Sequence, residues 1–365
     1  MDFSLNGEQE ALADSVRRFT ERDYGFDARR RIVDSASGIS DAHWAIFAEL
    51  GWLGAGLSES SGGFGGGAIE NAIIAERFGR ALVVEPFLAA VLALQTLDAL
   101  GDFDGRAALV DPVVAGETRL VLAHLEAAGR GDSKLVETEA RAAGEGWALT
   151  GGKSLVLGAP SADRLLVSAR DGDRVGLYLV EAHGPGCDLT SYRTLDNGRV
   201  ADLRLDCAPA TLLASDAQSA IDAALDHATI VACAEAVGAM DAALWMTRDY
   251  AQTRQQFGKP IGSFQAYQHR MADMLVRTEL ARSMLYQGLV ALVGPAEQRA
   301  TGVSAAKVVI GEAGLFLGRE AIQLHGGIGM TEEYAIGHYY KRLFVIAHLF
   351  GNADRHVERF ADLTL

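Results

Sequence analysis

Hydrophobic residues in the first third of the chain recur at the spacing of amphipathic helices. From Asn6 to about Asp111 they are separated by three or four positions, as in Leu12, Val16 and Phe19. This spacing places apolar side chains on one side of an α-helix and predicts a helical unit. The glycine-rich run SESSGGFGGG interrupts the unit at residues 58–67. No strand precedes the run at the spacing of a dinucleotide-binding turn, so it predicts a loop between helices.

The middle of the chain changes to short runs in which apolar and polar residues alternate. These runs lie between Thr118 and about Leu213, and three turn sequences separate them, Gly151-Gly152, Asp171-Gly172 and Asn197-Gly198. Alternation with such turns predicts a small antiparallel β domain. The expected strands lie near residues 119–124, 147–149, 155–157, 164–168, 175–180 and 200–205.

Helical spacing returns from Asp216 onward. The run 216–254 contains no proline, a second amphipathic stretch covers 264–293, and a third begins after Pro295. Long stretches joined by short connections predict an antiparallel bundle. We therefore expect a mainly α, α+β chain with an N-terminal helical domain (1–115), a middle antiparallel β domain (116–215) and a C-terminal four-helix bundle (216–365).

Composition narrows the classes of partner and compartment. The formal net charge of −15 argues against nucleic acid or an anionic membrane surface as a partner. Three widely spaced cysteines, Cys187, Cys207 and Cys233, have no metal-binding or disulfide pattern, so we expect buried, small apolar side chains. The N-terminus lacks a signal-peptide core, and no apolar run is expected to be long enough to span a bilayer. A soluble cytoplasmic protein without a membrane partner is the expectation.

Two segments near the C-terminus carry a family resemblance. They are RQQFGKPI at residues 254–261, followed by Gln265, and QLHGGIGMTEEYAIGHYYKRLFVIAHLFG at residues 323–351. Both resemble the C-terminal domain of the acyl-CoA dehydrogenases, and the helical, β, helical order matches that family along nearly the whole chain. The similarity is greatest to the short, base-lacking subunits of heteromeric members, such as those acting on pimeloyl-CoA or steroid side-chain CoA substrates.

The resemblance implies an FAD site at a subunit interface. In this family the diphosphate and adenosine of FAD are held by RxxFG and QxxGG motifs of the neighbouring chain. Arginine offers a fork of donors to a pyrophosphate, and glycine lets the backbone approach a ligand closely. The alternatives are a surface ion pair for the arginine, a core position for the phenylalanine and a helix cap for the glycines. The matching residues are Arg254, Phe257, Gln265, Gln323, Gly326 and Gly327.

The segments that would face this chain's own flavin ring depart from the family pattern. The chain has LEAAGRGD at residues 125–132 where the family has Thr-Glu-Pro-x-x-Gly-Ser-Asp, and GGKSLVL at 151–157 where it has Gly-x-Lys-x-Trp-Ile-Thr. Polar atoms of a buried ring need hydrogen-bond partners, which leucine side chains do not provide. We expect a degenerate isoalloxazine pocket. The changed positions are Leu125, Gly131, Leu155 and Leu157.

The resemblance also locates two positions for the catalytic glutamate, and both are apolar. They fall on Phe350 and Ala228, neither of which accepts a proton. Of the nearby carboxylates, Asp226, Glu235 and Asp354, each is expected to cap a helix or lie on the surface. The spacing of His325, His338, His348 and His356 fits no metal motif, so these histidines are expected to form structural hydrogen bonds and no metal site.

These observations favour the non-catalytic subunit of a flavin-dependent acyl-CoA dehydrogenase. It would form an α2β2 heterotetramer with a longer homologous subunit, which supplies the glutamate and the ring pocket. FAD as cofactor, an acyl-CoA substrate and electron-transferring flavoprotein as electron acceptor are implied by resemblance. Two alternatives stay open: a self-sufficient homomeric dehydrogenase that uses an unaligned base such as Asp226, and a flavin-free structural or regulatory homologue.

Overall fold

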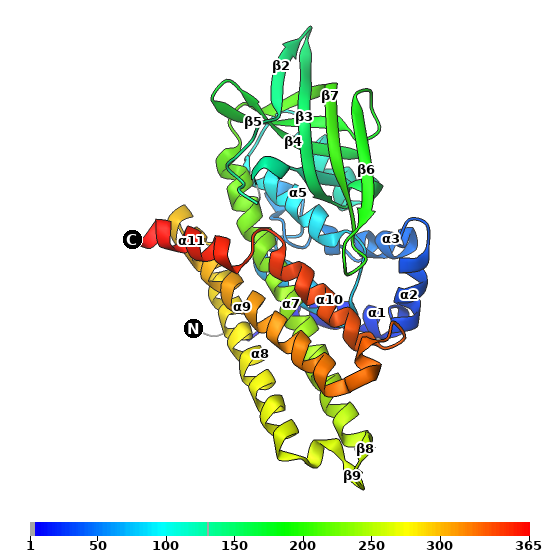
Figure 1. Ribbon diagram of the computed structural model, residues 1–365. Helices are drawn as coiled ribbons and strands as arrows, with labels where there is room; N and C mark the ends of the chain where they lie inside the picture. Colours follow the sequence, from blue (N-terminus) through cyan, green and yellow to red (C-terminus); the bar gives the residue numbers. More distant parts are fainter. Residues whose placement is uncertain (1–3, 130) are drawn as a thin grey trace. The chain divides into compact units, whose positions relative to one another are not determined.

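The computed structural model describes residues 4–129 and 131–365 (Figure 1). By their internal contacts these residues form two compact units. The first unit contains the described residues up to Arg31, residues 72–83 and residues 229–365. The second contains residues 32–71 and 84–228. The first third of the chain therefore contributes helices to both units, and the three-domain division stays a prediction.

Helices dominate the first third, as the apolar spacing predicts. Helix α1 begins after Asn6, whose side chain accepts the Gln9 backbone N–H while the Gln9 side chain accepts the Asn6 N–H. This reciprocal cap satisfies donors that the first turn leaves unpaired. The glycine-rich run is confirmed as a connection, with only a short 3-10 turn before α4. The helices are α1 (Gly7–Asp23), α2 (Phe26–Asp34), α3 (Asp41–Glu49), α4 (Ala68–Ala81), α5 (Phe87–Ala99) and α6 (Arg106–Val114).

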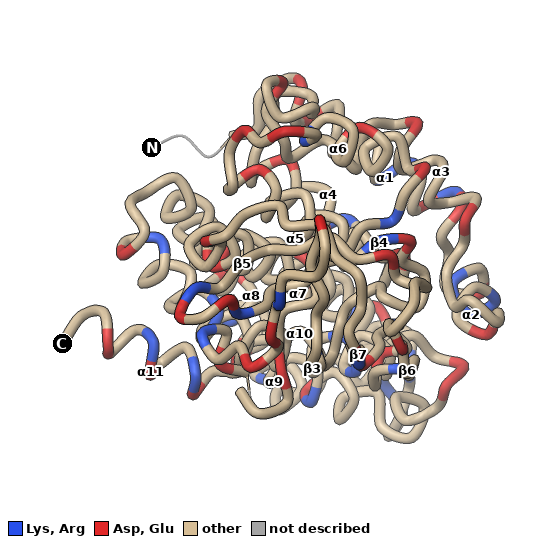
Figure 2. Tube along the Cα trace, turned by 90° about the horizontal axis from the view of Figure 1, so that it is seen from above, with Lys and Arg blue, Asp and Glu red and all other residues tan. Residues whose placement is uncertain are grey.

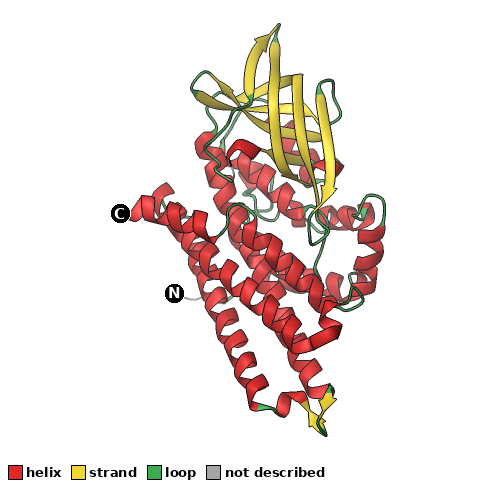
Figure 3. Cartoon of the chain, in the orientation of Figure 1, coloured by secondary structure: helices red, strands yellow, loops and turns green. Residues whose placement is uncertain are grey.

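The described residues of the middle segment form one sheet of seven strands; its strands are yellow in Figure 3. Strand pairing runs in the order β1-β4-β2-β3-β7-β5; β4 also pairs with β5, and β6 extends the sheet from β7. The pairings from β4 through β2, β3, β7 and β5 back to β4 close a ring, which encloses an apolar core. The strands are β1 (Leu120–Ala123), β2 (Glu139–Ala143), β3 (Gly146–Leu157), β4 (Arg164–Asp171), β5 (Arg174–Glu181), β6 (Cys187–Arg193) and β7 (Arg199–Ala214).

Three details of this sheet differ from the sequence prediction. Strand β1 pairs with β4 in parallel, because the connection between them is long enough to hold β2 and β3. Strands β2 and β6, which are mostly exposed, were not predicted. Gly151-Gly152 is not a turn but lies inside β3, where the register to β7 shifts after Leu149. The predicted turn at Asp171-Gly172 is confirmed, and Asn197-Gly198 lies in the connection between β6 and β7, next to the turn at Leu195-Asp196.

The C-terminal segment is a helical bundle, as predicted, with one helix beyond four. Helices α8, α10 and α11 all pack on α9. Helix α11 begins after Asn352, whose side chain accepts the Arg355 N–H, and carries both acidic and basic residues along its length (Figure 2). The helices are α7 (Gln218–Thr253), α8 (Gln265–Leu292), α9 (Ala296–His325), α10 (Ala335–His348) and α11 (Ala353–Thr364).

Two expectations from composition are wrong. By length and hydropathy, α7 and the segment Ala296–Met330 are both long enough to cross a membrane. The most apolar window of α7 is 78% buried within the protein, which is typical of a core helix, and that of the second segment is 50% buried. Among the cysteines only Cys233 is buried, whereas Cys187 is half-buried and Cys207 is exposed. All three thiols are free.

Helices α4 and α7 cross so closely that each presents a glycine to the other. A Cβ atom on Gly79 would overlap the Glu235 carbonyl oxygen, and one on Gly238 would overlap the Glu76 carbonyl oxygen. The same two glutamates form ion pairs with other helices: Arg342 of α10 holds Glu235 with N–O distances of 2.5 and 2.6 Å, and Arg282 of α8 holds Glu76 at 2.7 Å. The crossing therefore joins four helices around two reciprocal backbone contacts.

We expect Gly238→Ala to destabilise the protein by about 2 kcal/mol or more, because the new methyl group must push α4 and α7 apart. The matched control is Gly311→Ala in α9, where the nearest atom to an added Cβ would be Ala347 Cα at 3.8 Å. There the gain in helix propensity, up to about 1 kcal/mol, should make the substitution neutral or stabilising. Urea unfolding followed by circular dichroism measures both. Equal effects of the two substitutions would contradict the tight crossing.

Candidate functional site

The RQQFGKPI segment forms a small hairpin at the end of α7. The Arg254 N–H donates to the Tyr250 carbonyl at 2.8 Å and ends the helix. Strands β8 (Gln255–Gln256) and β9 (Lys259–Pro260) then flank a turn in which Phe257 has φ 54° and Gly258 φ 79°. The Phe257 side chain is 91% exposed, so the core alternative for it is wrong. The hairpin therefore exposes an aromatic ring, which meets Phe264 edge to face with ring centroids 6.1 Å apart.

The polar side chains next to this hairpin point to solvent. The Arg254 side chain is exposed and has no ion pair or hydrogen bond within the described part of the chain. The surface ion pair weighed as its alternative is therefore not observed. Gln265, the first residue of α8, is also exposed. Both side chains have their donors free for a ligand.

The QLHGG segment lies at the end of α9. Gln323, Gly326 and Gly327 are exposed, and a Cβ on either glycine would meet no atom within 4 Å. Gly326 has φ 66° and ψ −139°, a conformation that requires glycine. Its N–H donates to carbonyls of α9, so it also caps the helix, as the alternative reading expected. Helix capping and an open backbone surface coexist at this position.

Ring stacking brings the two segments together. Tyr250, one turn before Arg254, stacks on His325 with ring centroids 4.5 Å apart and an interplanar angle of 26°. At the start of α8, the Tyr267 hydroxyl donates to the Thr247 carbonyl of α7 at 3.2 Å. The ends of α7 and α9 and the start of α8 therefore lie side by side. All six predicted FAD residues come from this one region, and their contact with FAD stays a prediction.

In the β domain, the first ring-facing segment is anchored by a buried ion pair. Lys153 Nζ lies 2.6 Å from Glu126 Oε1, with side-chain exposures of 0% and 5%. The Glu126 carboxylate also accepts the N–H groups of Glu137 and Thr138 and the Thr138 hydroxyl. Burial raises the pKa of Glu126, but Lys153 and these hydrogen bonds lower it overall. Burial lowers the pKa of Lys153 to about 8 against the opposing effect of Glu126.

The ring-facing positions themselves offer hydrocarbon. Leu125, Leu155 and Leu157 are partly buried, and the Ser154 N–H donates to the Leu125 carbonyl at 2.8 Å, which places the two segments together. Gly131 is exposed, and the neighbouring Arg130 of the quoted segment lies outside the described residues. The two segments therefore keep the buried Glu and Lys of the family pattern and lose its ring-facing hydroxyls.

Even the backbone donor at Leu155 is already used. This residue lies in a bulge of β3 with φ 53°. Its N–H donates to Asp202 Oδ1 at 3.0 Å, and the same oxygen accepts the Tyr192 hydroxyl at 2.8 Å. Both partners come from the neighbouring strands β7 and β6. The Asp202 side chain therefore occupies the Leu155 N–H, which is not available to a ring at this position.

The two base positions have no proton acceptor in their side chains. Ala228 is fully buried in α7. Phe350 is partly buried between α10 and α11, with φ 59°, and its carbonyl accepts a hydrogen bond from His356 Nε2 at 3.1 Å. A left-handed backbone is uncommon for a bulky residue and persists only where its surroundings hold it. The hydrogen bond from His356 to the Phe350 carbonyl supplies such a restraint.

Two of the neighbouring carboxylates were predicted wrongly. Asp226 and Glu235 are 1% and 6% exposed, not surface charges or helix caps. The reason is that both lie in the part of α7 that is mostly buried, where neighbouring segments cover polar and apolar side chains alike. Glu235 is held by two charge-assisted hydrogen bonds from Arg342, so it is not free to act as a base. Asp354 is exposed in the first turn of α11, as expected.

Structural hydrogen bonding of the histidines is confirmed. His325 Nδ1 bonds the Ala321 carbonyl at 2.8 Å, His348 Nδ1 bonds the Phe344 carbonyl at 2.8 Å, and His356 bonds Ser304 and Phe350. His338 lies between the Arg29 guanidinium and the Glu332 carbonyl. Burial lowers the pKa of His325 and His338, which favours neutral rings. Within residues 4–129 and 131–365, no group of three potential metal ligands occurs.

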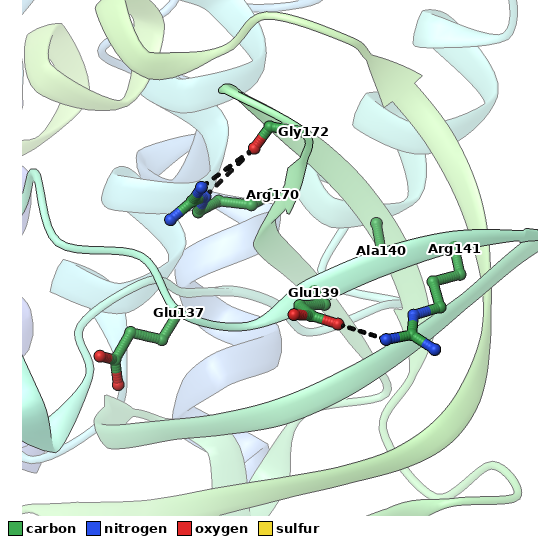
Figure 4. A pocket seen from close by; sticks show the side chains of 6 residues that line it. All are labelled: Glu137, Glu139, Ala140, Arg141, Arg170 and Gly172. Atoms are coloured by element: carbon green, nitrogen blue, oxygen red, sulfur yellow. Dashed lines mark hydrogen bonds and ion pairs between the residues drawn. The ribbon is translucent and has the colours of Figure 1, made fainter.

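The β domain also contains a polar pocket, shown in Figure 4. Its arginines are engaged within the pocket: Arg141 pairs with Glu139 at 2.8 Å, and Arg170 donates to the Gly172 carbonyl at 3.2 and 3.3 Å. None of the predicted cofactor residues lines it. The pocket is therefore separate from the candidate FAD residues. Its lining residues are Glu137, Glu139, Ala140, Arg141, Arg170 and Gly172.

Comparison with known proteins identifies the family. The family model for the N-terminal domain of acyl-CoA dehydrogenases matches residues 6–117, and the model for the C-terminal domain matches residues 217–363. The chain belongs to the acyl-CoA dehydrogenase family. Enzymes of this family are flavin-dependent oxidoreductases that act on acyl-CoA, with FAD as their general cofactor. The family resemblance and the fold predicted from the sequence are thus confirmed.

Individual acyl-CoA dehydrogenases match nearly the whole chain. "Acyl-CoA dehydrogenase IpdE2" of Mycolicibacterium smegmatis is 28% identical over 97% of this chain and 98% of that protein. A chain of the Tcur3481-Tcur3483 steroid acyl-CoA dehydrogenase superposes with a TM-score of 0.89 and 31% identity, covering 98% of this chain and 97% of that one. A chain of the ChsE4-ChsE5 complex from Mycobacterium tuberculosis gives 0.89 and 26%, covering 99% and 98%.

Removing the buried ammonium group of Lys153 should lower the free energy of unfolding. We expect Lys153→Ala to destabilise the protein by about 3–5 kcal/mol, because it leaves the Glu126 carboxylate buried without its counter-charge. Arg141→Ala is the control, since its pair with Glu139 is exposed and should contribute at most about 1 kcal/mol. Urea unfolding of both variants gives the comparison. A loss for Lys153→Ala no larger than that for Arg141→Ala would show that the buried pair does not anchor this segment.

Proposed function

We propose that this chain is the non-catalytic subunit of an FAD-dependent acyl-CoA dehydrogenase. It assembles with a longer homologous subunit as an α2β2 heterotetramer and supplies the interface side of the FAD site. One observation carries the proposal: the residues that match the family's FAD motifs are present and exposed, whereas the ring-facing and base positions of the same chain lack hydroxyl and carboxylate groups. A self-sufficient active site would need both sets.

The exposed residues suit the phosphate and adenosine part of FAD. The free Arg254 guanidinium donates charge-assisted hydrogen bonds to a pyrophosphate. Gln265 and Gln323 offer amide groups, and the open backbone at Gly326 and Gly327 allows close approach. Phe257 offers an apolar face. When bound, FAD supplies the hydride acceptor; the role of these residues is to bind and orient it.

The ring side requires a second subunit. Dehydrogenation of an acyl-CoA needs a carboxylate to take the α-proton while the β-hydride leaves. Phe350 and Ala228 take no proton, and the Glu235 carboxylate is held by Arg342. Leu155 offers no free backbone donor to a ring. We therefore assign the glutamate and the ring pocket to the longer partner.

The relatives support an assembly of this kind. ChsE4-ChsE5 is described as a complex, and Tcur3481-Tcur3483 is described as a steroid acyl-CoA dehydrogenase. By similarity to these proteins, we propose an acyl-CoA substrate and take steroid side-chain thioesters as the first to test. Electron-transferring flavoprotein is the acceptor that the family resemblance suggests.

Flavin content of the purified protein tests the proposal. We expect the chain to be colourless when it is expressed alone, because its ring-facing side is hydrocarbon. Expressed together with a longer homologue encoded beside it, it should form a yellow complex with one FAD per pair of unlike chains. Absorbance spectra, mass photometry and anaerobic bleaching by acyl-CoA measure this. A yellow, active homo-oligomer would refute the proposal, and a colourless complex would favour a flavin-free role.

Within that complex, Arg254→Ala should weaken FAD binding by about 10- to 100-fold, the equivalent of losing charge-assisted hydrogen bonds worth roughly 1.5–3 kcal/mol. Arg248→Ala, in the last turns of the preceding helix α7, is the matched control, because the Arg248 guanidinium lies over Trp245 and pairs with Asp249. It should leave FAD affinity unchanged. Fluorescence titration of the flavin-free complex compares the two. If Arg254→Ala binds FAD as tightly as the control, Arg254 does not contact the cofactor.

A further inference from the structure

The two FAD motifs are far apart in sequence but meet through a cluster of aromatic side chains. Tyr250 of α7 stacks on His325 of α9 at 4.5 Å between ring centroids. Tyr334, which precedes α10, lies 5.2 Å from the His325 ring and 6.4 Å from that of Tyr250. The three rings therefore contact one another pairwise and join the ends of α7 and α9 to the loop before α10.

The His325 ring is held in one orientation. It is 3% exposed, and Nδ1 donates to the Ala321 carbonyl one turn earlier at 2.8 Å. This bond makes Nε2 an acceptor, and Nε2 has no hydrogen-bond partner within the described chain. The imidazole thus acts as a flat, fixed surface against which Tyr250 packs. Sliding one ring over the other would reduce the contact area between them, and this loss opposes the movement.

Each residue of this stack is connected through its backbone to one of the two motifs. The Tyr250 carbonyl accepts the Arg254 N–H at 2.8 Å, so the position of Tyr250 sets where the RQQFG hairpin leaves α7. His325 immediately precedes Gly326, whose backbone turns away from α9. A shift between the two rings would therefore change the separation of Arg254 from the open glycine backbone. Neither ring belongs to the residues that the family motif assigns to FAD.

We propose that Tyr250 and His325 are positioning residues that hold the RQQFG and QLHGG motifs at the separation that FAD requires. We call this contact the Tyr250–His325 joint. The inference rests on the proposed function, because it concerns the same cofactor site. A positioning role and simple core packing predict different results. If the stack positions the motifs, its loss lowers FAD affinity but changes the stability of the flavin-free protein little. Tyr250 is only half-buried, which favours this separation of effects.

The test uses the complex of this chain with its longer partner, stripped of flavin and titrated with FAD. Tyr250→Leu removes the ring and should weaken FAD binding roughly three- to tenfold, the range expected for loss of one aromatic pair. Tyr250→Phe keeps the ring and should stay within about twofold of the wild type, since a conserved stack conserves the contact. The thermal midpoint of the flavin-free complex is measured for both and should be closely similar.

A second pair of variants guards against misfolding of Tyr250→Leu. His325→Phe keeps a flat ring and should retain FAD binding, whereas His325→Leu should lose it to the extent that Tyr250→Leu does. Equal FAD affinity of the leucine and phenylalanine variants at both positions would overturn the joint while leaving the proposed function intact. A wild-type complex without FAD would overturn both. Affinity losses that merely follow the drop in thermal midpoint would also overturn the joint and reduce it to core packing.

Discussion

The close crossing of α4 and α7 is the constraint on which the described arrangement of the first unit depends. Two glycines, Gly79 and Gly238, bring the helix backbones into contact, and Glu76 and Glu235 beside them reach Arg282 of α8 and Arg342 of α10. Helix α7 is thereby fixed against three other helices. Tyr250 lies near the C-terminal end of α7, and Arg254 follows that end. The packing of α4 against α7 therefore helps to determine where the candidate cofactor residues lie. The same contact removes Glu235 from the possible bases, because Arg342 already holds its carboxylate.

The β domain shows that a family motif contains residues with separable roles. Glu126 and Lys153 stay, because removing either would leave a charge buried without its partner. The ring-facing positions Leu125, Leu155 and Leu157 carry no hydroxyl and are partly buried. Asp202, which also accepts the Tyr192 hydroxyl, pairs with the Leu155 N–H. The segment thus keeps its path while the surface it presents becomes hydrocarbon. This is the pattern expected of a subunit whose fold is retained for assembly.

The candidate FAD residues show the opposite pattern. They are exposed, and Arg254 has no partner in the described chain, although acidic residues outnumber basic ones in the sequence, 48 to 33. Phe257 is held in a left-handed turn with 91% of its side chain exposed. A left-handed backbone and an exposed aromatic side chain lower the stability of an isolated chain. This loss is offset when a ligand or a second subunit covers the residue. Their grouping around the Tyr250–His325 joint gives the proposed interface a defined centre.

The sequence by itself determined what depends on neighbours along the chain. Apolar spacing predicted the helices, Asp171-Gly172 and Asn197-Gly198 predicted turns, and the motifs predicted the family. Tertiary structure decided what depends on distant residues: the parallel pairing of β1 with β4, the place of Gly151-Gly152 inside β3, and the burial of Asp226 and Glu235. Helical periodicity reports which side of a helix is apolar, but the neighbours that cover the rest of α7 come from remote segments. For the same reason, the stacking of Tyr250 on His325 became visible only when α7 and α9 were placed side by side.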